Sequence, residues 1–321
     1  MKNTSIILIL ILSVLIACKN SSKNTKAQQL QVLEKELPIK IDSVDIVGNL
    51  MYTDTNENCP LVIIIAGSGP TDRDGNNKLG IKAQPYKILA DSLVKYNIAT
   101  FRYDKRAIGQ STKVKEVNLK FEHYVGDVTK IVEYFRKNHK FSTIYLLGHS
   151  EGALIGAIAC SICNVDGFIS ASGTSKPAYE ILKQQLSTNR EIDQKELERV
   201  LNELKQGRVT VLNDKDLLMI FSLSVQPYII SWFKYNPIDE YSKISVPTLI
   251  VHGTTDIQVP VEQADELAKV TPKVQIAIIE EMNHIFKKAP KDKNLNQLTY
   301  INPQLPVCSE MVQNILKFIK K

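Results

Sequence analysis

Residues 143–152 read TIYLLGHSEG, and they predict a strand, a sharp turn and the start of a helix. Its first half, residues 143–147, is a short apolar run that predicts a buried strand. Its second half, residues 148–152, matches the G-x-S-x-G pattern of a sharp turn between a strand and a helix, and an apolar helix is expected to begin at Glu151. Such a turn holds Ser150 clear of the sheet at the helix N-terminus, where backbone N–H groups stabilise developing negative charge. Ser150 is therefore the candidate nucleophile.

Apolar segments on both sides of this turn alternate between strand and helix patterns. Residues 61–66 form a continuous apolar run, as expected of a parallel strand that is covered on both faces. Similar runs predict further strands at residues 98–103, 167–171, 248–252 and 274–279. Residues 37–52 alternate between apolar and polar side chains and predict one or two antiparallel strands. The sequence therefore predicts an α/β fold with a mostly parallel, doubly wound sheet.

One stretch, residues 174–241, interrupts this alternation because it contains no clear buried strand. Residues 191–206 predict a charged amphipathic helix, and residues 220–233 are apolar and aromatic and include the single tryptophan, Trp232. An insertion between two core strands predicts a helical cap over the sheet. The expected core then consists of residues 37–173 and residues 242–321.

A serine hydroxyl is a weak nucleophile unless a base activates it. The sequence offers five histidines: His123, His139, His149, His252 and His284. His284 follows the last predicted strand, at the end of the sheet where Ser150 is expected, and is the candidate base. Asp256, four residues after the strand that ends at His252, is the candidate acid, and Asp239 within the cap is a weaker one. Of the other histidines, we expect His123 and His139 at the surface, His149 to point away from the site and His252 to pack within its strand.

Two backbone N–H groups are needed to bind the oxyanion that forms during acyl transfer. Glu151, the residue after the nucleophile, is expected to supply one. The loop after the first parallel strand reads AGSGP over residues 66–70, and its small residues let the backbone approach a substrate carbonyl. Ser68 is the expected second donor, with Gly69 as the alternative.

These motifs resemble the α/β-hydrolase superfamily, and more narrowly its exported, esterase-like branch that is grouped with serine aminopeptidases. The resemblance covers roughly residues 40–320. Besides the G-x-S-x-G turn, it is carried by GSGPTDRD at residues 67–74, YDKR at 103–106, WFKYNP at 232–237, HGTTD at 252–256 with Val259-Pro260, and Asn283-His284. It implies the α/β-hydrolase fold and the chain order Ser150, Asp256, His284 for a catalytic triad.

The chain departs from this family pattern at two positions. Ala66 stands where the family usually has histidine before the oxyanion loop, which puts the geometry of that loop in question. Ala107 stands where glycine is usual after the arginine of the second loop. We expect charged side chains of these two loops to form a bracing network of ion pairs, made of Asp72, Arg73, Asp104 and Arg106.

These residues predict a serine hydrolase that cleaves carboxylic esters through an acyl-enzyme and requires neither a metal nor an organic cofactor. A peptidase or amidase with the same triad is the first alternative, and a non-catalytic binding module on the same fold is the second. The composition is that of a globular protein, with 44% hydrophobic and 23% charged residues. The net charge of +6 is spread along the chain and does not favour nucleic acid as a partner.

The first seventeen residues are expected to be a signal peptide. Lys2 precedes an apolar run over residues 5–17, which is too short to span a bilayer comfortably. The run ends in LIAC at residues 15–18, which resembles the lipobox of bacterial lipoproteins, and the polar residues 18–36 are expected to be a tether. This predicts lipid attachment at Cys18 and a lipid-anchored protein of the bacterial cell envelope. A plain secretory signal is the alternative.

Four further cysteines lie in the chain: Cys59, Cys160, Cys163 and Cys308. Cys160 and Cys163 have C-x-x-C spacing, but no second pair and no nearby histidine complete a zinc site. We interpret this pair as small apolar residues of a buried helix. The sequence leaves open whether any of the four cysteines form disulfides.

Overall fold

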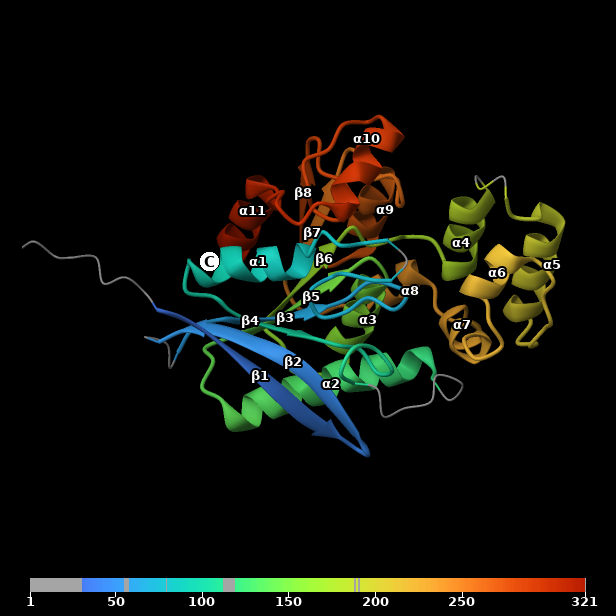
Figure 1. The fold of residues 1–321 in the computed structure, drawn as a ribbon. Helices are drawn as coiled ribbons and strands as arrows, with labels where there is room; N and C mark the ends of the chain where they lie inside the picture. Colours follow the sequence, from blue (N-terminus) through green and yellow to red (C-terminus); the bar gives the residue numbers. More distant parts are fainter. Residues whose placement is uncertain are drawn as a thin grey trace, which may run out of the picture.

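The computed structural model describes residues 31–54, 58–78, 80–111, 119–187, 189 and 191–320. Its central feature is an eight-stranded sheet with the strand order β1-β2-β4-β3-β5-β6-β7-β8 (Figure 1). The strands are β1 (Val32–Ile41), β2 (Val44–Thr53), β3 (Leu61–Ile65), β4 (Ala99–Tyr103), β5 (Ile144–His149), β6 (Gly167–Ala171), β7 (Thr248–Gly253) and β8 (Val274–Ile279). The last six of these pair in parallel, whereas β1 and β2 add an antiparallel edge. The predicted mostly parallel α/β sheet is confirmed.

The start of β1 corrects the predicted boundary between the tether and the core. β1 begins at Val32, so residues 32–36 belong to the sheet and not to the polar tether predicted for residues 18–36. The charges that suggested a tether have partners on neighbouring elements: Glu34 pairs with Arg102, and Glu36 pairs with Arg73. Charged side chains are a common way to protect an edge strand from pairing with another chain.

Helices cover both faces of the sheet. On one face lie α1 (Pro85–Val94) and α11 (Ser309–Ile319), and on the other lie α2 (Phe121–Asn138), α3 (Glu151–Cys160), α8 (Pro237–Ser242) and α9 (Glu262–Val270) (Figure 1). Because side chains alternate along a strand, Ile63 packs in the core under α2 and α3, whereas Val62 and Ile64 pack under α1. Both faces are apolar, which explains the continuous apolar run of β3.

The cap is a separate group of four helices, visible to one side of the sheet in Figure 1. These are α4 (Ala178–Ser187), α5 (Gln194–Lys205), α6 (Lys215–Ile220) and α7 (Gln226–Trp232). They have a core of their own, which includes Leu197, Val200, Leu201, Leu204, Leu217, Phe221 and Ile229. The next helix, α8, packs on α3 and α9, and Tyr241 at its end forms a 2.7 Å hydrogen bond with Ser170 of β6. The insertion thus ends on the main core of the protein.

The remaining helical segments are α10 (Lys293–Leu298) and the short 3-10 helix η2 (Thr299–Ile301), between β8 and α11. No helix among the described residues is long and apolar enough to cross a bilayer. Cys18 and the predicted signal peptide lie outside the described residues. Cys160 is buried at the end of α3 as expected, whereas Cys163 lies beyond that helix and is half-buried. None of the four described cysteines forms a disulfide.

Candidate active site

Ser150 stands in a strained turn between β5 and α3, as the sequence predicts. Its φ of 54° and ψ of −118° lie outside the helix and strand regions that L residues favour. The flanking glycines are required by close backbone approach. A Cβ at Gly148 would lie 2.2 Å from the Gly152 carbonyl oxygen, and one at Gly152 would lie 2.3 Å from the Ile65 carbonyl oxygen. The turn therefore fits tightly against β3 and holds Ser150 at the start of α3.

Asp256 and His284 come from the loops after β7 and β8, and their side chains meet. His284 Nδ1 lies 2.7 Å from Asp256 Oδ2. Asp256 Oδ1 accepts the backbone N–H groups of Gln258 and Val259 at 2.8 and 2.9 Å, which fixes the carboxylate. With Nδ1–H donated to Asp256, the imidazole leaves Nε2 as a proton acceptor.

The carboxyl group of Asp256 is fully buried. Burial alone would raise the pKa of Asp256, but His284 and His252 beside it hold that pKa well below its usual range. The acid therefore keeps its negative charge. A charged, fixed carboxylate in this position would stabilise a protonated imidazole at His284.

His252 has a second contact that the sequence reasoning missed. It is fully buried, as expected of a strand residue, and its Nε2 lies 3.0 Å from the Val259 carbonyl oxygen and 3.3 Å from Asp256 Oδ2. His252 and Asp256 are four residues apart across the end of β7, and this spacing could have indicated the contact between them. His252 thus helps to hold the candidate acid in place.

His149 connects the Ser150 turn to two other segments of the site. Its Nδ1 accepts the hydroxyl of Tyr86 at 2.7 Å, and its Nε2–H donates to the carbonyl oxygen of His284 at 2.9 Å. Tyr86 in turn accepts the N–H of Gly67 at 3.0 Å. Burial and the nearby His284 lower the pKa of His149 well below its usual value, so the ring is neutral and this set of donors and acceptors is consistent. One chain of hydrogen bonds therefore links the oxyanion loop, the Ser150 turn and the His284 loop.

The oxyanion loop lies against the Ser150 turn. A Cβ at Gly67 would lie 3.3 Å from Ser150 Cβ and 3.2 Å from His149 Nδ1. The N–H of Gly67 is already bound by Tyr86, which leaves the next residues of the loop to face a substrate. Ser68 and Gly69 are exposed, and both line the same cavity as Ser150 and Glu151. The placement of Ser68 and Glu151 as oxyanion donors stays a prediction.

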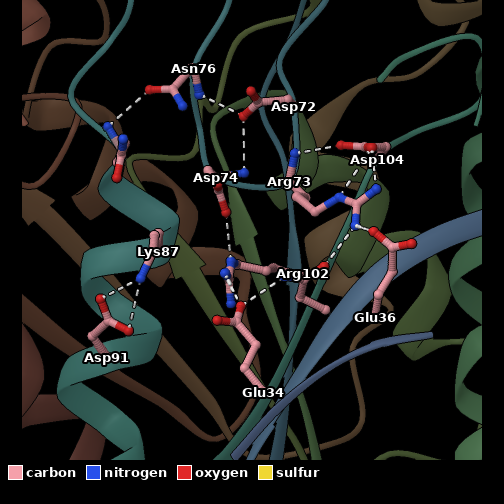
Figure 2. A network of polar contacts seen from close by, with 12 residues as sticks. Glu34, Glu36, Asp72, Arg73, Asp74, Asn76, Lys87, Asp91, Arg102 and Asp104 are labelled. Atoms are coloured by element: carbon pink, nitrogen blue, oxygen red, sulfur yellow. Dashed lines mark hydrogen bonds and ion pairs between the residues drawn. The ribbon is translucent and has the colours of Figure 1, made fainter. Parts of the chain in front are cut away.

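The network of charges behind these loops differs in part from the prediction (Figure 2). Arg73 binds Asp104 as expected, through its backbone N–H at 2.8 Å and its guanidinium at 2.7 and 3.1 Å. Arg106, however, pairs with Asp127 of α2 at 2.7 Å. Asp72 accepts the N–H groups of Asp74 and Asn76 within its own turn and pairs with neither arginine in this network. The expected four-residue network is therefore correct for Arg73 and Asp104 and wrong for Arg106 and Asp72.

A cavity of about 580 Å³ lies between the sheet and the cap. Ser150, Glu151, His284 and the oxyanion loop line it on the core side. Apolar side chains line it on the cap side, namely Leu182, Leu186, Met219, Ile220, Val225, Ile229 and Trp232. Ser68, Ser150, Glu151 and His284 thus face one substrate-sized cavity, whereas Asp256 is not among the residues that line it. Within the described ranges, no group of histidine, cysteine and carboxylate side chains is arranged to hold a metal ion.

Comparisons with known proteins agree with this architecture. A family described as "Serine aminopeptidase, S33" matches residues 79–222, a range that includes Ser150 and stops before Asp256 and His284. Esterase EstD of Thermotoga maritima is 26% identical over 236 residues, which cover 71% of this chain and 54% of EstD. The probable lysophospholipase L2 of Haemophilus influenzae is 28% identical over 207 residues, which cover 63% of this chain and 60% of that protein. The chain thus spans little more than half the length of these curated relatives.

Among solved structures, Est1E of Butyrivibrio proteoclasticus with bound ferulic acid is similar, with a TM-score of 0.59 and 20% identity. The match covers 89% of this chain and all of that one. At this level of identity the likeness concerns the fold. The sheet order, the strained serine turn and these matches together show that the chain has the α/β-hydrolase fold and is similar in sequence to an esterase and a probable lysophospholipase.

Proposed function

We propose that the protein is a serine hydrolase that cleaves carboxylic esters. The observation that carries this proposal is the 2.7 Å contact between His284 Nδ1 and Asp256 Oδ2, with His284 and Ser150 lining one cavity. A nucleophile, a base and an acid that orients the base are the parts that acyl transfer requires.

In the proposed reaction Ser150 Oγ attacks the ester carbonyl carbon while His284 Nε2 takes the hydroxyl proton. The carbonyl π electrons move to oxygen, and the N–H groups of Glu151 and Ser68 stabilise the resulting oxyanion. The tetrahedral intermediate then collapses, the bond to the alkoxy group breaks, and His284 returns its proton to the leaving alcohol. Water, deprotonated by His284, attacks the acyl-enzyme in the same way and releases the carboxylic acid and Ser150.

Ester substrates are favoured over peptides by the charges in the cavity. A peptidase that reads a free amino terminus needs an uncompensated carboxylate to bind the ammonium group. Among the described residues that line the cavity, the only carboxylate is that of Glu151, and it is paired with Lys105 at 3.3 Å. The names of the two curated relatives, an esterase and a probable lysophospholipase, support an ester substrate too.

A fluorophosphonate probe tests the proposal, because it labels only an activated serine. The wild-type protein should be labelled and the Ser150→Ala variant should not. Turnover of p-nitrophenyl esters should exceed turnover of aminoacyl-nitroanilides. No labelling of folded wild-type protein would favour a non-catalytic binding module, and faster cleavage of the nitroanilides would favour a peptidase.

We also propose that the mature protein is attached to the bacterial cell envelope through a lipid at Cys18. The support is the LIAC sequence at residues 15–18 and the apolar run that precedes it. Metabolic labelling with a palmitate analogue should tag the wild-type protein and leave the Cys18→Ser variant untagged. Equal labelling of both proteins would refute this attachment.

A further inference from the structure

The cavity contains a buried ion pair that the proposed reaction does not use. Lys105, just after β4, and Glu151, the first residue of α3, are each only 2% exposed, and Lys105 Nζ lies 3.3 Å from Glu151 Oε1. Lys105 Nζ also donates to the carbonyl oxygen of Gly67 at 2.6 Å and lies 4.9 Å from the centre of the Tyr124 ring. The ammonium group is therefore fully occupied, and its charge cancels that of Glu151.

Two buried polar atoms of this part of the cavity, Glu151 Oε2 and the hydroxyl of Tyr228 on α7, make no hydrogen bond of ordinary geometry with the described residues. The Tyr228 hydroxyl interacts with the Glu151 carboxylate itself, so the two groups face one another. Burial and the charge of Glu151 raise the pKa of Tyr228 well above its usual value, so its hydroxyl keeps its proton. A buried polar atom without a partner costs free energy, and in a binding site a ligand can supply the missing partner.

The position of these atoms relates them to the reacting bond. Glu151 directly follows Ser150, so their Cα atoms are about 3.8 Å apart. Both residues and Tyr228 line the same cavity. A substrate whose carbonyl is at Ser150 therefore lies beside Glu151, and its groups near that carbonyl are the ones placed to reach the Glu151 side chain.

We propose that Glu151 and Tyr228, with Lys105 as the counterion, form a subsite for a neutral hydroxyl group on the acyl part of the ester, close to its carbonyl. This inference rests on the proposed ester hydrolysis. The substrate O–H donates to Glu151 Oε2, and its oxygen accepts from the Tyr228 hydroxyl, so each of these atoms gains a hydrogen bond of ordinary geometry. The subsite makes hydroxyacyl esters the preferred substrate class.

Other substituents fit these charges less well. An ammonium group would add an uncompensated positive charge beside Lys105, and a carboxylate would face the oxygen of Glu151. An alkyl group would make neither of these two hydrogen bonds, and sites built to hydrogen-bond a substrate discriminate strongly against analogues that lack the group.

Matched methyl esters test the inference, with acid release followed in a pH-stat. Methyl 3-hydroxybutyrate, 3-methylbutyrate and 3-aminobutyrate differ at one position and have similar shapes, and lactate and isobutyrate esters form a second pair. The hydroxy ester of each series should have a kcat/KM at least about tenfold above its alkyl partner, the effect of one good hydrogen bond to a charged group. In Tyr228→Phe this ratio should fall by about tenfold.

Tyr179→Phe is the matched control, because Tyr179 lies in the cap and its hydroxyl bonds Glu180 at the surface. In this variant the ratio of kcat/KM for the hydroxy ester to kcat/KM for the alkyl ester should equal the wild-type ratio. Equal kcat/KM for hydroxy and alkyl esters, an unchanged ratio in Tyr228→Phe, or a preference for the amino ester would each overturn the subsite while leaving ester hydrolysis intact. Failure of the proposed function is seen separately, as no cleavage of any ester and no fluorophosphonate label on Ser150.

Discussion

Replacing Tyr86 with phenylalanine should impair both stability and turnover. Tyr86 is 1% exposed, and its hydroxyl is bound on two sides, by Gly67 N–H at 3.0 Å and by His149 Nδ1 at 2.7 Å. The variant keeps the ring but leaves one buried donor and one buried acceptor without a partner. Each such group costs about 1–3 kcal/mol, so we expect the free energy of unfolding to fall by about 2–6 kcal/mol.

The effect on turnover follows from what the hydroxyl connects. It joins the oxyanion loop to His149, and His149 donates to the backbone of His284 at 2.9 Å. Without Tyr86 the loop and the base are no longer held relative to one another, and small displacements of catalytic groups reduce the rate strongly. We expect kcat on a p-nitrophenyl ester to fall by roughly 10- to 100-fold, with a smaller change in KM.

Urea denaturation and steady-state kinetics measure the two effects separately. Tyr145→Phe is the matched control: Tyr145 is also a buried tyrosine of the sheet core, but its hydroxyl bonds Ile319 at 3.5 Å, away from the cavity. That variant should keep its kcat. If Tyr86→Phe loses stability but retains the wild-type kcat, the hydrogen-bond chain is structural only and the positioning argument is refuted.

Three further predictions concern the triad, the pH profile and the backbone. Alanine at Ser150, Asp256 or His284 should each lower kcat by orders of magnitude, and the double variants should lose little more, because the three act as a unit; additive losses measured by steady-state kinetics would contradict this. The pKa of Asp256 is held below its usual range, so Asp256 stays ionised and should add no step of its own to the pH profile. On the acid side of the profile, log kcat/KM should therefore rise with pH with a slope no greater than one, and a slope of two would disagree. Ala107 has a φ of 65°, so Ala107→Gly should raise the free energy of unfolding by roughly 1 kcal/mol in urea denaturation, and a destabilised variant would show that this strain is not real.

The sequence was most informative where a short pattern determines the local backbone. The glycines around Ser150 predict the turn because only glycine fits against Ile65 and within the first turn of α3. The parallel strands are evident because both faces are covered and their side chains are continuously apolar. Ala107 has a left-handed backbone conformation, which also explains why the family that this sequence resembles usually has glycine at that position.

Partner choice among charged and polar side chains could not be predicted in the same way. Arg106 pairs with Asp127 because α2 brings a buried carboxylate beside it, and Asp104 is already bound by Arg73. From the sequence alone, Glu34 is predicted to be part of a polar tether. In the structure it pairs with Arg102, which comes from a strand far along the chain. Such pairs depend on the packing of distant segments, which neither spacing nor composition reveals.

The polar contacts divide the molecule into a fixed part and a variable part. The loops after β3, β5 and β8 are joined by the Gly67–Tyr86–His149–His284 chain of hydrogen bonds, and the strained backbone of Ser150 persists because these neighbours hold it. The cap, by contrast, has an apolar core of its own and supplies one apolar wall of the cavity. Substitutions on the cavity side of the cap should therefore change which acyl groups fit and leave the reacting groups in place. In the proposed reaction, selectivity and catalysis are thus carried by different elements of this fold, and Glu151, which lines the cavity beside Ser150, takes part in both.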